Sequence, residues 1–155
     1  MNKVPVTVVI ITKNEEKRLP DCLRSVAWAD EIIVLDDDSA DRTVELAKQA
    51  GCKVFRRTME NEGRHRNYGI SLASHDWVLS LDADERVTPE LAEEIKKVCE
   101  TKDDPNACYS MPIKTFIGSE WIEGAGYYPA CRDKLLHKNR FRYKEERVHP
   151  PVSYQ

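Results

Sequence analysis

The 155-residue sequence has no apolar run near the roughly 18 residues that a membrane-spanning helix needs, and its N-terminus lacks the apolar core of a secretory signal. Cysteine is also scarce. The five cysteines are odd in number and include no Cys-x-x-Cys pair, which argues against a disulfide framework and against a zinc ribbon. We therefore expect reduced thiols and a cytoplasmic location, with the inner face of the membrane as a second option.

An excess of charge of one sign is lacking as well. The 24 lysines and arginines nearly balance the 27 acidic residues, which gives a formal net charge of -3. Hydrophobic residues make up 41% of the chain and charged residues 33%, a composition that excludes intrinsic disorder and is typical of a globular domain. We expect a single domain over residues 1–155 and no nucleic-acid partner.

Continuous apolar, β-branched runs are typical of strands that are covered on both faces. Three such runs occur, at Val6–Thr12, Ile32–Leu35 and Trp77–Leu81. A shorter strand is predicted at Cys52–Arg56. Helical patterns alternate with these strands, at Pro20–Trp28, Thr43–Ala50 and Arg66–Ala73. The alternation predicts an α/β fold, with a Rossmann-like, mainly parallel sheet and helices on both of its faces.

The remaining part of the chain begins with a helix signal and then changes character. Thr88-Pro89-Glu90 combines an N-cap residue, a proline at the first helical position and an early acid, so a helix is expected to start there. Beyond Asp103-Asp104-Pro105-Asn106 the pattern predicts a short antiparallel part, with strands at Tyr109–Ile117, Lys134–His137 and Phe141–Tyr143.

Polar side chains follow three of the predicted strands directly. The clusters are Thr12-Lys13-Asn14-Glu15, Asp36-Asp37-Asp38-Ser39 and Asp82-Ala83-Asp84-Glu85. In an open α/β sheet, ligands bind outside the carboxyl ends of the strands. We therefore expect the three clusters to meet at one edge of the sheet and to form the binding site.

So many carboxylates in one crevice repel one another unless a cation compensates them. The Asp82-x-Asp84 spacing places both side chains near one turn, and hard oxygen ligands suit Mn²⁺ or Mg²⁺. Such an ion takes one or two protein carboxylates and completes its shell with water and substrate phosphate. The alternative is that Asp36–Asp41 only caps the next helix and that Asp82–Glu85 is a solvated turn.

A second polar group, Glu62-Gly63-Arg64-His65-Arg66-Asn67, opens the helix before the third long strand. Two arginines near a helix N-terminus can bind phosphate or a base edge, and the glycine permits close approach. A surface helix start with solvated charges is the alternative.

Four motifs occur in a fixed order over about the first 100 residues. They are Val-Val-Ile-Ile-Thr-Lys-Asn-Glu-Glu (8–16), Ile-Val-Leu-Asp-Asp-Asp-Ser-Ala-Asp-Arg-Thr (33–43), Gly-Arg-His-Arg-Asn (63–67) and Leu-Asp-Ala-Asp-Glu (81–85). With them the sequence resembles the family 2 glycosyltransferases, inverting enzymes of the GT-A fold that use nucleotide sugars. The segments at residues 28–32 and 84–86 are similar to the branch that adds sugars to the lipopolysaccharide core.

The resemblance implies roles for particular residues. Around the nucleoside it places Thr12, Asn14 and Glu15, and it gives Asp36 or Asp37 a contact to the base or ribose. Nearer the diphosphate and the sugar it places four further residues: Arg64 and Arg66 beside the base or diphosphate, Asp82 by the ribose or sugar, and Asp84, with Asp82, at the metal.

The resemblance also implies an overall activity. The chain would move a sugar from a nucleoside diphosphate sugar, with UDP expected, to a cell-envelope glycan or a lipid-linked acceptor. Residues 1–104 would bind the nucleotide sugar, and residues 105–155 would form a partial acceptor side. A homodimer is one further expectation.

The sequence departs from the family pattern at two places. Asp38 stands where many relatives have glycine, and Val148-His149-Pro150 lacks the glutamate that commonly follows this histidine. An inverting transfer needs a general base. Its identity is therefore unknown, and the unranked candidates are Glu120, Glu123, Asp133, Glu145 and Glu146.

The stretch 132–147 carries seven basic residues against three acids. The basic residues are Arg132, Lys134, Lys138, Arg140, Arg142, Lys144 and Arg147. This stretch could contact anionic lipid headgroups or phosphorylated acceptors, and a solvated face is the alternative.

Two other functions compete with the transferase. A nucleotide-sugar-binding protein with weak catalysis would explain the missing glutamate and the short chain. A phosphorylation-dependent receiver module would carry its acidic pair after the first strand, where this chain has Thr12-Lys13-Asn14-Glu15.

Overall fold

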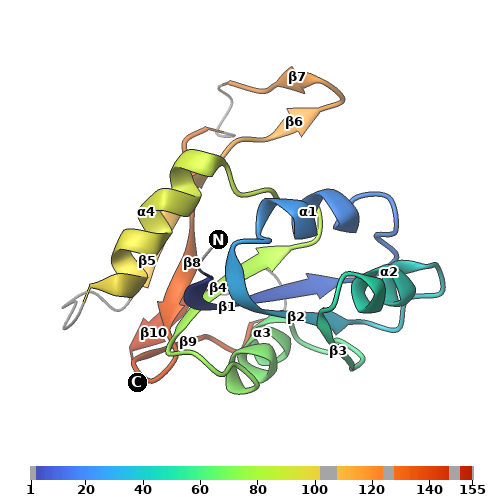
Figure 1. Ribbon diagram of the computed structural model, residues 1–155, viewed down its shortest axis with the longest axis horizontal. Helices are drawn as coiled ribbons and strands as arrows, with labels where there is room; N and C mark the ends of the chain where they lie inside the picture. Colours follow the sequence, from blue (N-terminus) through green and yellow to red (C-terminus); the bar gives the residue numbers. More distant parts are fainter. Residues whose placement is uncertain (1–2, 102–107, 124–127, 147–150, 155) are drawn as a thin grey trace.

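The computed structural model describes residues 3–101, 108–123, 128–146 and 151–154. Its main sheet has six strands in the order β3-β2-β1-β4-β8-β5 (Figure 1). The bounds of these strands are Val4–Thr12 (β1), Ala29–Asp36 (β2), Lys53–Arg56 (β3), Trp77–Asp82 (β4), Cys108–Ile113 (β5) and Ala130–His137 (β8). The helices are Leu19–Ser25 (α1), Thr43–Gln49 (α2), Glu62–Ser71 (α3) and Pro89–Glu100 (α4).

Strands β1 to β4 are parallel, as the βα alternation predicts. The strand β1 pairs with β2 on one side and with β4 on the other. Its last residues fix how the strand ends align: Thr12 lies opposite Asp36, and Ile11 lies opposite Asp82. The polar clusters that follow β1, β2 and β4 therefore start from one edge of the sheet.

Two apolar cores cover the two faces of the sheet. Alternate residues of β1 point to opposite sides, so Val8 joins one core and Val9 the other. The larger core packs α1, α2 and α4 against the sheet, and the smaller one packs α3 and the strand β9 (Phe141–Tyr143). This arrangement confirms the predicted α/β fold with helices on both faces.

Local signals explain where the helices begin and end. The Thr88 hydroxyl accepts the Leu91 amide at 3.3 Å and caps α4, as predicted. Gly51 follows α2 with a φ of +79°, the left-handed conformation that favours glycine. The helix α3 starts at Glu62, the first residue of the polar group expected to open it and four residues before the predicted Arg66–Ala73 pattern. The Asn61 side chain caps it there by accepting the Arg64 amide at 3.0 Å.

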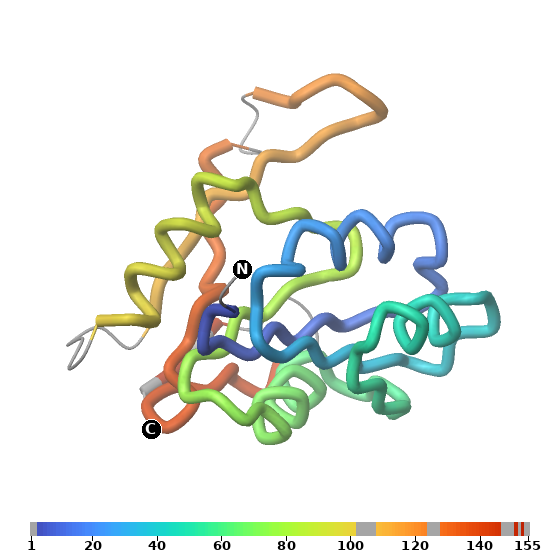
Figure 2. The backbone as a smooth tube through the Cα atoms, in the orientation of Figure 1, coloured from blue at the N-terminus to red at the C-terminus, as the bar shows by residue number. Residues whose placement is uncertain are grey.

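The C-terminal part extends the same sheet in the antiparallel sense. The strand β8 pairs with β4 on one side and β5 on the other, and Figure 2 shows this late part of the chain returning beside β4 and α3. A two-stranded hairpin, β6 (Phe116–Ile117) and β7 (Glu120–Trp121), stands away from the main sheet, and β10 (Val152–Tyr154) pairs with β9. The predicted boundary between residues 104 and 105 lies outside the described residues.

None of the helices in the described part of the chain is long and apolar enough to cross a membrane. All five cysteines are free thiols. Cys22 is buried, and burial raises the pKa of its thiol to about 12, which disfavours a nucleophilic role.

Candidate functional site

The site is built where β1, β2 and β4 end. Hydrogen bonds tie the loops after β1 and β2 together: the Asn14 amide donates to Ser39 Oγ at 2.8 Å, and the Ala40 amide donates to Asn14 Oδ1 at 2.8 Å. The Glu15 amide donates to the Thr43 hydroxyl at 2.8 Å. Asn14 and Glu15 therefore lie in one rigid pair of loops, as expected from their position.

Two buried oxygens at these strand ends have no hydrogen-bond partner among the described residues: Thr12 Oγ1 and Asp36 Oδ1. Thr12 and Asp36 face each other across β1 and β2. The other carboxylate oxygen of Asp36 accepts the Ser39 amide at 3.0 Å and lies 3.6 Å from Arg56 Nε. An unsatisfied buried oxygen is costly, so a pair at the predicted nucleoside site favours a functional reason for keeping them.

Asp37 is buried and held from both sides. One oxygen accepts the Met59 amide at 2.8 Å, and the other lies 2.9 Å from Lys13 Nζ. Burial alone would raise the pKa of Asp37, but the Met59 and Lys13 hydrogen bonds bring that pKa below its ordinary value. Asp37 is therefore an anion with a fixed orientation.

Asp38, the residue that replaces the family glycine, keeps a glycine-like backbone. Its φ is +51°, in the left-handed region that aspartate tolerates better than most residues. Its carboxylate accepts a hydrogen bond from the Thr58 hydroxyl. An aspartate therefore adopts here a backbone conformation that glycine favours.

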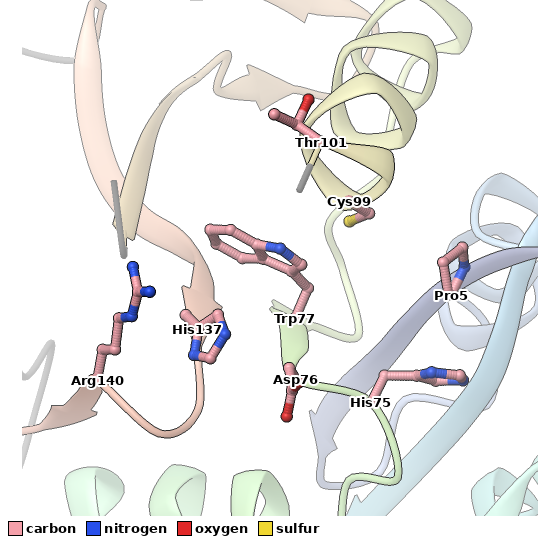
Figure 3. Close-up of a pocket in the computed structure, with 8 residues that line it drawn as sticks. All are labelled: Pro5, His75, Asp76, Trp77, Cys99, Thr101, His137 and Arg140. Carbon is pink, nitrogen blue, oxygen red and sulfur yellow. The ribbon is translucent and has the colours of Figure 1, made fainter. Parts of the chain in front are cut away.

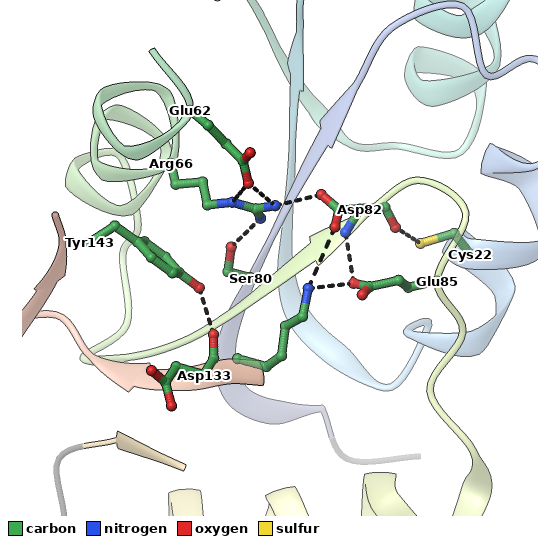
Figure 4. A network of polar contacts seen from close by, with 9 residues as sticks. Cys22, Glu62, Arg66, Ser80, Asp82, Glu85, Asp133 and Tyr143 are labelled. Carbon is green, nitrogen blue, oxygen red and sulfur yellow. Dashed lines mark hydrogen bonds and ion pairs between the residues drawn. The ribbon is translucent and has the colours of Figure 1, made fainter. Parts of the chain in front are cut away.

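Asp82, which is partly exposed, pairs with the buried Arg66 at the end of β4 (Figure 4). The Arg66 Nη2 atom lies 2.6 Å from Asp82 Oδ1, Nη1 donates to Ser80 Oγ at 2.9 Å, and Nε donates to Glu62 Oε1 at 2.9 Å. Arg66 is only 5% exposed, so the alternative of a surface helix start with solvated charges is wrong for this residue. Its role beside the base or diphosphate stays a prediction, and the contacts show that it orients Asp82.

The pKa values of this pair reflect the same contacts. Burial raises the pKa of Asp82, yet Arg66 and Lys134 together bring it below its ordinary value. Burial lowers the pKa of Arg66, while Asp82, Tyr143 and Glu62 raise it above its ordinary value. Asp82 is therefore ionised and its charge is already compensated.

Lys134, from β8, is the site residue that the sequence did not reveal. It is buried, and its Nζ lies 2.8 Å from Glu85 Oε2 and 3.6 Å from Asp82 Oδ2.

The basic stretch 132–147 is therefore not one solvated face. Lys138 is also half-buried, with its Nζ donating to the Ala73 carbonyl at 2.9 Å. The exposed members are Arg132, Arg140, Arg142 and Lys144, and Arg147 lies outside the described residues.

Asp84 differs from Asp82 in having a free carboxylate. It is exposed, and it makes no hydrogen bond or ion pair with a described residue. No group of three metal-binding side chains occurs among the described residues. A metal here would thus take Asp84 and complete its shell with phosphate and water, as Mg²⁺ commonly does. Asp82, already compensated by Arg66 and Lys134, fits a direct metal contact less well.

Arg64 lies away from the strand ends, on the first turn of α3. Its Nε atom is 2.7 Å from Glu145 Oε2, and both side chains are exposed. The adjacent Gly63 packs against the same segment, because a Cβ atom there would lie 1.9 Å from the Lys144 carbonyl oxygen. The structure therefore gives Arg64 and Gly63 a contact with the chain after β9, and the phosphate role of Arg64 stays a prediction.

The five candidates for the general base are scattered. Glu120 and Glu123 are exposed at the β6–β7 hairpin, and Glu145 pairs with Arg64. The Asp133 carboxylate accepts the Ser110 hydroxyl. Glu146 is exposed, and the segment Val148-His149-Pro150 lies outside the described residues.

Two cavities lie at opposite edges of the sheet. One, of about 310 Å³, is lined by Asn14 and Glu15 and lies beside the predicted nucleoside residues. The other, of about 360 Å³, lies at the amino ends of β1 and β4, where Trp77 stacks edge-on with His137 at 5.4 Å (Figure 3). Because ligands of such sheets bind at the carboxyl ends, we assign the site to the first edge.

The chain is similar in sequence to known glycosyltransferases. An uncharacterized glycosyltransferase of Rickettsia typhi is 39% identical over 94 residues, which cover 60% of this chain and 32% of that protein. The lipopolysaccharide core biosynthesis glycosyltransferase LpsC of Rhizobium meliloti is 29% identical over 109 residues, covering 66% and 40%. The chain spans about a third of the length of curated relatives such as the first.

The fold itself matches solved GT-A glycosyltransferases. The structure of S. aureus TarS residues 1–349 superposes with a TM-score of 0.65 at 19% identity, over 94% of this chain and 51% of that one. The sequence profile described as Glycosyl transferase family 2 matches residues 7–150, nearly the whole chain. With strand-end clusters, fold and profile in agreement, this chain belongs to glycosyl transferase family 2.

Proposed function

We propose that this chain binds a nucleoside diphosphate sugar at the carboxyl edge of its sheet and serves as the donor-binding part of a glycosyltransferase. The observation that carries the proposal is the contrast between two neighbouring carboxylates. Asp82 is held by two buried cations, whereas Asp84 faces solvent without a partner among the described residues. One acid is oriented, and the other is free to meet a cation.

The nucleoside would lie over the ends of β1 and β2. Thr12, Asn14, Glu15, Asp36 and Asp37 all belong to this region, and the free oxygens of Thr12 and Asp36 could accept hydrogen bonds if the loops shift to admit a ligand. We expect UDP, since TarS, a protein of the same fold, has been solved with UDP-GlcNAc.

A divalent cation, Mn²⁺ or Mg²⁺, would be held by Asp84, with Asp82 oriented beside it. Such an ion neutralises charge on the departing nucleoside diphosphate. The chain's own contribution is positional: Arg66 and Lys134 keep Asp82 ionised and fixed, so that its carboxylate can bind a ribose or sugar hydroxyl.

The acceptor would be a cell-envelope glycan or a lipid-linked sugar, and the name of LpsC supports this class. We further propose inversion at the sugar carbon, a cytoplasmic location and a homodimer. We also propose a membrane contact through the exposed basic residues of 132–147.

The second candidate function is nucleotide-sugar binding with weak catalysis. It is favoured by the scattered positions of the described base candidates. Sugar transfer to an acceptor, beyond donor hydrolysis, would separate the two.

The test is calorimetric titration of UDP into the chain with Mn²⁺, with Mg²⁺ and with excess chelator. We expect binding only when a divalent cation is present, and at 100 times the dissociation constant the complex should be stabilised by about 2.7 kcal/mol. The Asp84→Asn variant should lose affinity for UDP with Mn²⁺ by at least about 100-fold, since even outer-shell partners of a metal contribute 10–100-fold.

Glu93→Gln, on the exposed surface of α4, is the matched control and should bind UDP like the parent chain. Because Asp84 is exposed, its amide variant should keep the parent melting temperature. Equal binding in chelator, or unchanged Mn²⁺-dependent binding in Asp84→Asn, would remove the metal from this turn.

A further inference from the structure

Lys134 comes from the C-terminal antiparallel part, yet it enters the donor site. Its two charged contacts are with Glu85, in the loop after β4, at 2.8 Å and with Asp82, the last residue of β4, at 3.6 Å. A buried ammonium must be paired, and these two carboxylates provide the pairing. The contact therefore links two parts of the chain that are 49 residues apart in the sequence.

The strand β8 is irregular at this residue. Tyr109 pairs with Leu135, but the next residue of β5, Ser110, pairs with Asp133, so Lys134 is the extra residue of a β-bulge. The backbone beside it is fixed, because the Tyr143 hydroxyl donates to the Asp133 carbonyl at 2.8 Å. Bulges often turn a side chain toward a functional site.

The loop that Lys134 contacts is a tight turn. The Glu85 amide donates to the Asp82 carbonyl at 3.0 Å, and the Asp82 amide donates to Glu85 Oε2 at 2.9 Å. The same Glu85 oxygen accepts from Lys134. Lys134 thus holds both ends of the turn, and Asp84 lies between them with its carboxylate exposed.

We infer that Lys134 is a positioning residue of the donor site, which fixes the turn of residues 82–85 so that Asp84 is presented to a metal–diphosphate ligand. The inference rests on the proposed function for its ligand and on the contacts of Lys134 for its geometry. It also assigns the C-terminal part a share in donor binding, beside the acceptor role expected for it.

The experiment measures UDP affinity with saturating Mn²⁺ for three variants of the 155-residue chain. Lys134→Met should weaken binding about 10- to 150-fold, the range expected for loss of a charged hydrogen bond. Lys134→Arg should restore most of the affinity, because it keeps the charge. Lys144→Met, an exposed lysine of the same stretch, is the control and should bind like the parent.

Amide hydrogen exchange gives a second readout that needs no ligand. The amides of Asp82 and Glu85 should exchange at least about tenfold faster in Lys134→Met than in the parent or in Lys144→Met. If the parent chain fails to bind UDP, the proposed function fails, and the exchange result alone decides the role of Lys134.

Lys134→Met leaves Glu85 without its cation and could fail to fold. The double variant Lys134→Met with Glu85→Gln removes both charges and should fold, yet bind UDP with Mn²⁺ as weakly as expected for the single variant. Parent-like affinity in either folded variant, or unchanged exchange at Asp82 and Glu85, would overturn the inference.

Discussion

The strand β2 carries a buried carboxylate near each of its ends, and their surroundings differ. At the amino edge, the Glu31 carboxylate accepts from the Thr7 hydroxyl at 2.5 Å, from Lys53 at 2.5 Å, and from the Ser74 amide and hydroxyl, both at 2.8 Å. At the carboxyl edge, Asp36 has one oxygen bonded to Ser39 and the other without a partner among the described residues.

The different surroundings of Glu31 and Asp36 indicate a structural role for the first carboxylate and a ligand-binding role for the second. A carboxylate surrounded by four donors is satisfied by the protein alone, and here it connects β1, β2 and β3 with the loop before β4. A buried carboxylate with a free oxygen is not satisfied, and its retention is understandable at an edge where ligands bind. We therefore expect the two ends of one strand to differ in role, the amino end stabilising the fold and the carboxyl end binding a ligand.

The largest effect is expected at the amino edge. Glu31→Gln should lower the free energy of unfolding by about 3 kcal/mol at pH 7, because hydrogen bonds lower the pKa of Glu31 to about 2 against the opposing effect of burial. Since the folded-state pKa lies below the ordinary 4.5, this stabilisation is present above pH 4.5 and is lost as the pH falls toward 2. Urea unfolding of parent and variant at pH 7 and pH 3 measures the difference.

Exposed Glu93→Gln is the control for that comparison and should change stability by less than about 0.5 kcal/mol. A Glu31→Gln loss no larger than the control's would mean that the four donors contribute little.

A smaller effect is expected at the carboxyl edge. Asp36→Asn should cost about 1 kcal/mol of stability, since the amide oxygen can still accept from the Ser39 amide and the other atom has no bond to lose. UDP affinity should fall by tenfold or more. Unfolding and calorimetry on one preparation separate the two effects. A stability loss as large as that of Glu31→Gln, with unchanged UDP affinity, would make Asp36 a structural residue.

The smallest effect is expected at Asp38. Asp38→Gly restores the residue that many relatives carry, at a position whose φ of +51° suits glycine. Relief of strain is offset by loss of the Thr58 contact and by a more flexible unfolded chain. Stability should change by less than about 0.5 kcal/mol and UDP affinity by less than about twofold. A change of 2 kcal/mol in unfolding experiments would show that Asp38 reshapes the loop.

Much of the fold could be predicted because local signals and the long-range pairing agree. The apolar run Val6–Thr12 lies within β1, and the Thr88 N-cap predicted α4. The helical pattern placed the start of α3 at Arg66, whereas the polar group expected to open the helix begins at Glu62, where α3 starts. The Asn61 cap was not recognised, because many loop asparagines make no such cap. The short strands β7 and β10 were missed, although β9, which is as short as β10, was predicted.

Which candidate site residues lie close together could be predicted where each of them ends a strand. Thr12, Asp36 and Asp82 end neighbouring strands, so sheet topology alone brings them together. Lys134 could not be found this way, because its inward direction depends on a bulge between β5 and β8. The burial of Arg66 was missed for a similar reason: its partners Ser80 and Asp82 lie on another element.

The central claim is that a metal–diphosphate ligand binds at the carboxyl edge, at the turn that carries Asp84. The direct measurement is amide NMR of the ¹⁵N-labelled chain with UDP and a small amount of paramagnetic Mn²⁺. The account predicts selective broadening of the Ala83, Asp84 and Glu85 amides, while those of residues 75–77 at the opposite edge stay sharp. Broadening centred on residues 75–77, with sharp signals at 83–85, would contradict it.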